Sequence, residues 1–231
     1  MPYRTLLLLS ALVFLGTVGQ VESSAASGKL VRVEFEGRIK TTANDPFGEP
    51  YAHWRNKEVK GYFVYDPSTP NALTPEQVEK KRIKRIAGKK SKRTLKEETT
   101  HLYLQDLKQP GLEIRLPGHE IVGSRRSLIR VTYRELDTKN SQFLLKDGSR
   151  AYVEYKKRDQ HGRLKVDGET VKDAQVTLHF VDQGQTLKGA ELPARFPFTL
   201  GKDLRIGASV GIGRSSILFE VTKLSWKTVS R

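Results

Sequence analysis

The residues best suited to chemistry are lysines and arginines, which crowd together between residues 80 and 96. Closely spaced cations bind phosphate, sulfate or carboxylate polymers by releasing condensed counterions, without sequence specificity. The segment therefore predicts binding to an anionic polysaccharide, to lipid headgroups or to another polyanion. The alternative is a solvated loop that has no ligand. The ten cations are Lys80, Lys81, Arg82, Lys84, Arg85, Lys89, Lys90, Lys92, Arg93 and Lys96.

A second basic group is expected on or beside a hairpin. No aromatic residues are interleaved with the first basic run, which disfavours a stacking platform for single-stranded nucleic acid. The sequence also contains no motif for sequence-specific DNA recognition. The members of the second group are Lys156, Lys157, Arg158, Arg163 and Lys165.

The composition gives little support to a metal site or a cofactor. The chain has no cysteine, which excludes disulfides, thiolate nucleophiles and Cys-based zinc or iron–sulfur sites. Its five histidines show no H-x-H or H-x-x-x-H grouping. The pair His119-Glu120, beside the Pro117-Gly118 turn, is the best seed for a metal site, but we predict neither a metal nor a cofactor.

No catalytic motif is evident, so we predict no catalytic residue. The chain lacks G-x-S-x-G, and the glycine-rich stretch 207–213 lacks the Lys-Ser/Thr of a phosphate-binding loop, which favours close strand packing there. Several glutamates are expected on the outer faces of strands, where solubilising charge is common. A carbohydrate-active pair among them remains an alternative. These glutamates are Glu34, Glu36, Glu113, Glu154 and Glu220.

Aromatic side chains offer one further candidate, a small ligand surface made by Tyr51, His53 and Trp54. For Trp226 we favour packing at the rim of the core. In the stretch GYFVYDPSTP, residues 61–70, Asp66 is expected to bond local backbone groups while the prolines end the strand.

The N-terminus resembles a signal peptide in layout. Arg4 precedes an apolar run from about Leu6 to Val18, and small residues surround Ala26. We expect cleavage near Ala26, so that residues 1–26 are removed and no membrane span remains. The protein is then secreted or periplasmic. Removal of Arg4 and Glu22 leaves the formal charge of +15 unchanged.

The elements that must position these residues are strands, because period-two alternation recurs along residues 27–231. In Val31, Val33 and Phe35, for example, apolar residues share one face. Near residue 222 the phase slips, as a β-bulge allows. Turn signals such as Asp66-Pro67 and Lys146-Asp147-Gly148 separate the runs. An all-β single domain follows, either an antiparallel sandwich or a barrel, and we favour a jelly-roll-like β-sandwich.

Residues 74–97 are expected to form a basic helical insertion. Thr74 is a suitable N-cap, Pro75 a suitable first helical residue, and Gln77 completes a capping box. Few apolar residues follow, so only a narrow stripe of this helix can pack against the domain.

The sequence resembles exported bacterial β-sandwich proteins that often carry a PEP-CTERM sorting signal. The resemblance lies in the signal peptide, in YDPSTP ending an early strand, and in a late strand followed by Leu192-Pro193 and a final hairpin from ARFPF to KLSW. It implies the fold and export, and no common activity. The chain lacks the Pro-Glu-Pro motif at its end.

Together these patterns predict an exported, non-catalytic protein that binds an anionic envelope or extracellular polymer through its basic insertion. The alternatives are a carbohydrate-binding or carbohydrate-active protein and a structural matrix component without a ligand. The oligomeric state is left open.

Overall fold

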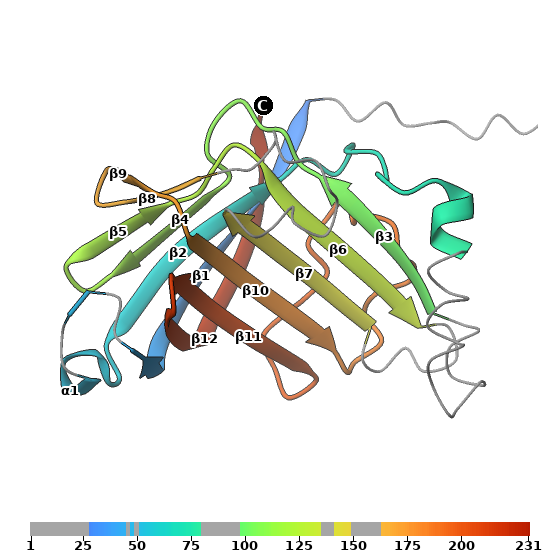
Figure 1. The fold of residues 1–231 in the computed structure, drawn as a ribbon. Helices are drawn as coiled ribbons and strands as arrows, with labels where there is room; N and C mark the ends of the chain where they lie inside the picture. Colours follow the sequence, from blue (N-terminus) through green and yellow to red (C-terminus); the bar gives the residue numbers. More distant parts are fainter. Residues whose placement is uncertain (1–27, 45–46, 49–50, 80–97, 135–140, 149–162) are drawn as a thin grey trace, which may run out of the picture.

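The computed structural model describes residues 28–44, 47–48, 51–79, 98–134, 141–148 and 163–231 (Figure 1). Their regular structure is almost all β. The short helix α1 spans Tyr51–Trp54, and residues 75–79 are also helical. The strands are β1 (Lys29–Ala43), β2 (Glu58–Tyr65), β3 (Glu98–Leu104), β4 (Leu112–Leu116), β5 (His119–Val122), β6 (Ser127–Arg134), β7 (Ser141–Gly148), β8 (Leu164–Val166), β9 (Glu169–Val171), β10 (Ala174–Asp182), β11 (Leu204–Ile212) and β12 (Ser215–Ser230).

These strands form one curled antiparallel sheet, in the order β3-β6-β7-β10-β11-β12-β1-β2-β4-β5-β8-β9 (Figure 1). The prediction of an antiparallel all-β fold is confirmed. The finer prediction of a sandwich or jelly roll is not confirmed, because the described strands are hydrogen-bonded into a single sheet and its curvature brings the core faces together.

One long hairpin links the β3–β6 pair at one end of the sheet to the β4–β5 pair near the other end. Between the β3–β6 pair and the β4–β5 pair, the backbone bonds continue from Gln105 N to Ser127 O, from Leu107 N to Arg125 O and from Gly111 N to Ser124 O. Residues 98–116 and 119–134 therefore run side by side along their length. Since β6 also pairs with β7 and β4 with β2, the hairpin joins the edges of the curl.

The core lies inside the curl and follows the predicted alternation. Val31, Val33 and Phe35 are at most 3% exposed, and Val176, Leu178 and Phe180 are equally buried. The predicted bulge is also present: β1 pairs with Lys223 and then with Val221, so the register passes over residue 222. Beyond it Trp226 lies opposite Val33 and is 37% exposed.

The irregular segment between β10 and β11 fills the centre of the curl with Phe196 and Phe198. The Phe196 ring lies 5.2 Å from that of Phe180 and 5.7 Å from those of Phe63 and Phe143. Edge-to-face packing of this kind is the favoured geometry of aromatic clusters. The interior is therefore packed with side chains that come from four separate parts of the sequence.

Candidate functional site

The predicted polyanion-binding cations, Lys80 to Lys96, lie outside the described residues, but the start of the predicted insertion, with helical residues 75–79, is described. Thr74 Oγ1 accepts a hydrogen bond from Gln77 N at 3.2 Å, and Gln77 Oε1 accepts one from Thr74 N at 3.0 Å. This is the capping box that the sequence predicts.

The start of the insertion is held on the outer face of β3 and β6. Leu73 packs with Leu102 and Leu128, and Val78 covers the same apolar cluster. The backbone is also fixed there, since Ala72 N donates to Leu102 O and Asn71 Oδ1 accepts from Leu102 N. The chain therefore enters the basic run from a fixed point on the sheet.

Two cations stand beside this anchor, on the same outer face. Arg130 is the cross-strand partner of Leu102, and Lys146 is that of Leu128. We call Arg130, Lys146 and the neighbouring His179 the cationic face. Among the described residues, no carboxylate forms an ion pair with Arg130 or Lys146, whereas Arg134 pairs with Glu98 at 3.1 Å.

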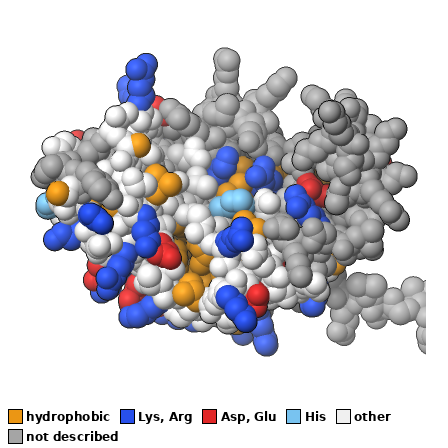
Figure 2. All heavy atoms as spheres, turned by 90° about the horizontal axis from the view of Figure 1, so that it is seen from below, with side chains coloured by type: hydrophobic (Ala, Val, Ile, Leu, Met, Phe, Trp, Pro, Cys, Tyr) orange, Lys and Arg blue, Asp and Glu red, His pale blue; other side chains and the backbone are white. Residues whose placement is uncertain are grey.

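His179 is held neutral by its surroundings. It lies on the outer side of β10, as the sequence predicts, and its Nε2 is 3.2 Å from Gln142 Oε1. Burial lowers the pKa of His179, and the charges of Arg130 and Lys146 lower it further. On the face shown in Figure 2, Lys and Arg side chains stand beside exposed apolar and histidine side chains.

The second basic group is described only in part. Arg163 and Lys165 are exposed, the latter in β8, while Lys156, Lys157 and Arg158 lie outside the described residues. The structure therefore does not place this group as a unit.

Of the possible ligand surface predicted at Tyr51, His53 and Trp54, the structure describes the burial of His53 and Trp54. Trp54 is 0% exposed and belongs to the core, where its ring lies 5.6 Å from that of Phe47. His53 is exposed and meets the Trp54 ring edge-on at 5.2 Å. The Trp54 side chain therefore cannot contribute contact area to a ligand outside.

The histidine of the best metal seed, His119, takes part in packing. Its Nδ1 lies 2.7 Å from Asp167 Oδ2, and its ring stacks on Phe47 at 3.8 Å. The hydrogen bond with His119 lowers the pKa of Asp167. Within the described ranges, no three His, Asp or Glu side chains are grouped so that they could hold a metal ion.

Asp66 ends its strand as predicted and has an additional partner. Its Oδ1 accepts hydrogen bonds from Ser68 N at 2.9 Å and from Ser68 Oγ at 2.6 Å. Its Oδ2 lies 2.7 Å from Arg231 Nη2, and no local sequence pattern predicts this ion pair.

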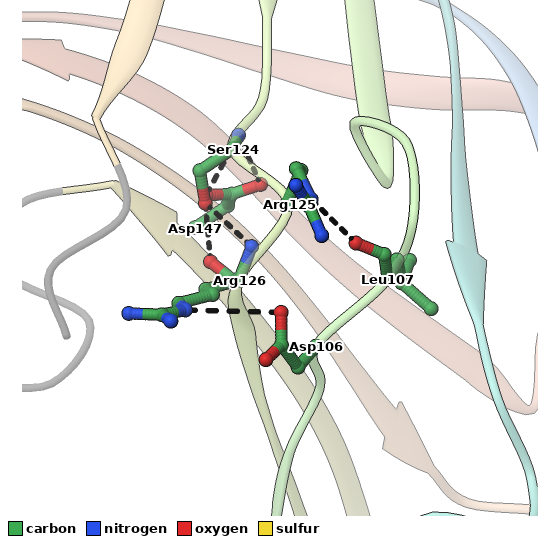
Figure 3. A network of polar contacts seen from close by, with 6 residues as sticks. All are labelled: Asp106, Leu107, Ser124, Arg125, Arg126 and Asp147. Carbon is green, nitrogen blue, oxygen red and sulfur yellow. Dashed lines mark hydrogen bonds and ion pairs between the residues drawn. The ribbon is translucent and has the colours of Figure 1, made fainter.

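A buried carboxyl group at Asp147 is the most perturbed acid among the described residues. Asp147 is 0% exposed, and burial raises its pKa to about 7 (Figure 3). Ser124 lies against it, with Oγ 2.7 Å from Asp147 Oδ1 and N 3.1 Å from Oδ2. Perturbed acids often mark active sites, but this one is enclosed, so its contacts serve the fold.

An open hollow of about 750 Å³ lies on the outer face of β12, β1, β2 and β4. We call it the polar hollow. Cross-strand pairing brings its residues together, because Glu34 lies opposite Tyr62, and Tyr62 opposite Glu113. The sequence predicts these glutamates as solubilising surface charges, with a carbohydrate-active pair among them as the alternative, and the register shows that Glu34 and Glu113 lie in one hollow. Its charged side chains include Glu34, Glu36, Glu113, Lys60, Arg115 and Lys223.

In the described part of the chain, no helix is both long and apolar enough to cross a membrane. Comparisons of the chain with protein-family models, with curated proteins and with solved structures find no match. The residues themselves therefore carry the functional argument.

Proposed function

We propose that this protein is exported and binds an anionic polymer of the cell envelope or extracellular matrix, through the basic run Lys80 to Lys96 together with the cationic face. The observation that carries the proposal is the position of Arg130 and Lys146. Both are cross-strand neighbours of the leucines on which the start of the insertion packs. The basic run therefore leaves the sheet next to the cationic face.

The cationic face favours an anion because its charges are not neutralised by described carboxylates. Exposed cations that are paired with acids contribute little net attraction, whereas unpaired ones attract a polyanion at a distance. The half-buried position of Arg130 and Lys146 also limits screening by salt compared with fully exposed side chains.

A polymer fits better than a single small anion. Each phosphate, sulfate or carboxylate that is neutralised releases counterions, so affinity grows with the number of cations in register. Ten cations in one run and two more beside its anchor can engage several charges of one chain at once.

Retention on heparin tests the proposal. Replacement of the ten cations by glutamine, and separately the double change Arg130→Gln with Lys146→Gln, should each lower the salt concentration at which the protein elutes. The matched control is Lys172→Gln with Arg214→Gln, which removes two exposed charges at turns elsewhere. The proposal fails if the control and the test variants elute together.

A second readout reports directly on the cationic face. An anion bound between Arg130 and Lys146 stabilises the imidazolium form, so the pKa of His179, followed by NMR, should rise when heparin is added. If heparin binds and this pKa does not move, the cationic face is not part of the site, and the basic run acts alone.

A further inference from the structure

We infer that the polar hollow is a binding site for a neutral polyhydroxylated ligand, a saccharide unit. The inference is independent of the proposed polyanion binding, because the hollow lies on β12, β1, β2 and β4 and the cationic face on β6, β7 and β10.

In the polar hollow the three glutamates and Arg32, whose side chain is 32% exposed, lie deeper than the other three cations. The side chains of Glu34, Glu36 and Glu113 are 20 to 39% exposed. Those of Lys60, Arg115 and Lys223 are 54 to 73% exposed. A ligand therefore meets donors first and acceptors deeper in.

Ion pairs hold these groups in place. Lys223 Nζ is 2.7 Å from Glu36 Oε2, and Arg115 Nη2 is 2.7 Å from Glu113 Oε1. Glu34 Oε1 is 2.9 Å from Arg32 Nε, and the Arg32 guanidinium lies 3.6 Å from the centroid of the Tyr62 ring. Such a site loses little side-chain entropy when a ligand binds.

This arrangement disfavours ions and suits hydroxyl groups. An anion would face three carboxylates and a single cation, Arg32, at the floor, and a cation would pass three cations at the rim. A hydroxyl group donates one hydrogen bond and accepts others, so neighbouring hydroxyls can donate to a carboxylate and accept from an ammonium or guanidinium. Hydrogen bonds to charged groups are about twice as strong as neutral ones.

Leu200 supplies the apolar contact that a sugar ring also needs. It is 43% exposed, one of the largest exposed apolar side chains described, and it borders the hollow. The C–H face of a pyranose can pack against it while the hydroxyls bond to the charged groups.

The ionisation of Glu34 and Glu36 disfavours hydrolysis by this pair. A glycosidase needs one carboxyl group that stays protonated as a general acid. Here the hydrogen bond from Lys227 lowers the pKa of Glu34, and that from Lys223 lowers the pKa of Glu36. Both therefore remain ionised acceptors at neutral pH.

Affinity electrophoresis in gels that contain a soluble neutral polysaccharide tests the inference, with dextran, mannan, β-glucan and arabinoxylan as the probes. At least one should retard the protein. Glu34→Ala, Glu113→Ala and Leu200→Asp should each weaken this retardation tenfold or more. Glu220→Ala, which removes an ion-paired glutamate of β12 outside the hollow, should not.

The two proposals are distinguished by their salt dependence and their variants. Retardation by a neutral polysaccharide should change little in 0.5 M salt. Glu34→Ala and Glu113→Ala should elute from heparin no earlier than the wild type, because each change removes a negative charge and leaves its cation partners unpaired. Thermal unfolding verifies that each variant is folded, and Leu200→Asp alters a side chain that the core does not need. The inference is overturned if none of the four polymers retards the protein, or if retardation survives all three hollow variants.

Discussion

Asp147 Oδ1 and Ser124 Oγ lie 2.7 Å apart inside the protein, and together they fasten β7 to the kink between β5 and β6 (Figure 3). The Ser124 hydroxyl has one proton but two close acceptors, Asp147 and the carbonyl oxygen of Arg126, and it already accepts from Arg126 N. Ser124 Oγ donates to Asp147 Oδ1, and Ser124 N also donates to the same carboxyl group. Residues 123–125 of this kink form backbone hydrogen bonds with Leu107, Gly111 and Leu112. The contact between Asp147 and Ser124 therefore stabilises the long hairpin formed by residues 98–134.

Asp147→Asn should remove a pH dependence from the stability. The pKa of Asp147 is about 7 in the folded protein, against an ordinary value of 3.8, so the folded state holds the extra proton. The stabilisation is complete below pH 4 and is lost as pH rises through 7. Between pH 5 and pH 8 the wild type should therefore lose roughly 3 kcal/mol of stability relative to the variant.

Urea unfolding at pH 5, 6, 7 and 8 measures this difference. The comparison with the variant cancels the contributions of other titrating groups, and Asp173→Asn, at an exposed turn, is the matched control. Parallel curves for the wild type and Asp147→Asn would contradict the assignment.

Ser124→Ala should weaken the same contact from the other side. The hydrogen bonds from Ser124 lower the pKa of Asp147, so without the hydroxyl this pKa should rise further. The free energy of unfolding should fall by about 1 to 3 kcal/mol, because buried polar groups lose a partner. Ser230→Ala, at an exposed position, should change it by less than about 0.5 kcal/mol. An unchanged stability for Ser124→Ala would show that the contact is not needed.

Local patterns predicted much of the strand structure. A shift of one residue would turn every side chain of a strand to the other face, and the inner faces of β1 and β10 agree with the alternation. The capping box at Thr74 and the bulge at residue 222 are likewise encoded within a few residues. The capping box and the bulge could be predicted because each is determined by residues close to it in the sequence.

Features set by distant pairing could not be predicted in this way. Lys146-Asp147-Gly148 has the composition of a turn, yet it lies in β7, because Asp147 finds its partner 23 residues earlier. Glu34 and Glu113 look like separate surface charges until the pairing of β1, β2 and β4 brings them into one hollow. The resemblance places residues 194–198 at the start of a final hairpin, whereas Phe196 and Phe198 enter the core.

Phe196→Ala should be among the most destabilising changes in the segment between β10 and β11. Its ring is 2% exposed and contacts Phe63, Phe143 and Phe180, so the truncation leaves a cavity. A loss of about 3 to 5 kcal/mol is expected. Arg195→Ala, an exposed neighbour, is the control. Chemical denaturation compares them, and equal stabilities would contradict the packing.

Tyr103→Phe should loosen the same segment without opening a cavity. Tyr103 Oη donates to Ala190 O at 2.8 Å, and burial raises the pKa of Tyr103 to about 12, so the hydroxyl stays a donor at all ordinary pH values. Loss of this bond should cost about 1 kcal/mol or slightly more. Amide hydrogen exchange should then quicken in residues 183–203 more than in β1. Equal acceleration of exchange across the whole protein would contradict a local role for the hydrogen bond between Tyr103 and Ala190.

Gly61→Ala should destabilise the protein, because β2 and β4 lie close together at residue 61. The polar hollow depends on this close packing. A Cβ atom at residue 61 would lie 2.5 Å from the carbonyl oxygen of Glu113 and 2.6 Å from Cζ of Phe35. Both distances are shorter than real Cβ contacts, so a strand or the ring must shift, at a cost of about 1 to 3 kcal/mol. At Gly201 the added methyl group meets nothing within 4 Å, so Gly201→Ala should be close to neutral. Thermal unfolding of the two variants measures the difference. Equal midpoints would contradict the close packing of β4 on β2 that follows from the pairing of Gly61 with Ile114.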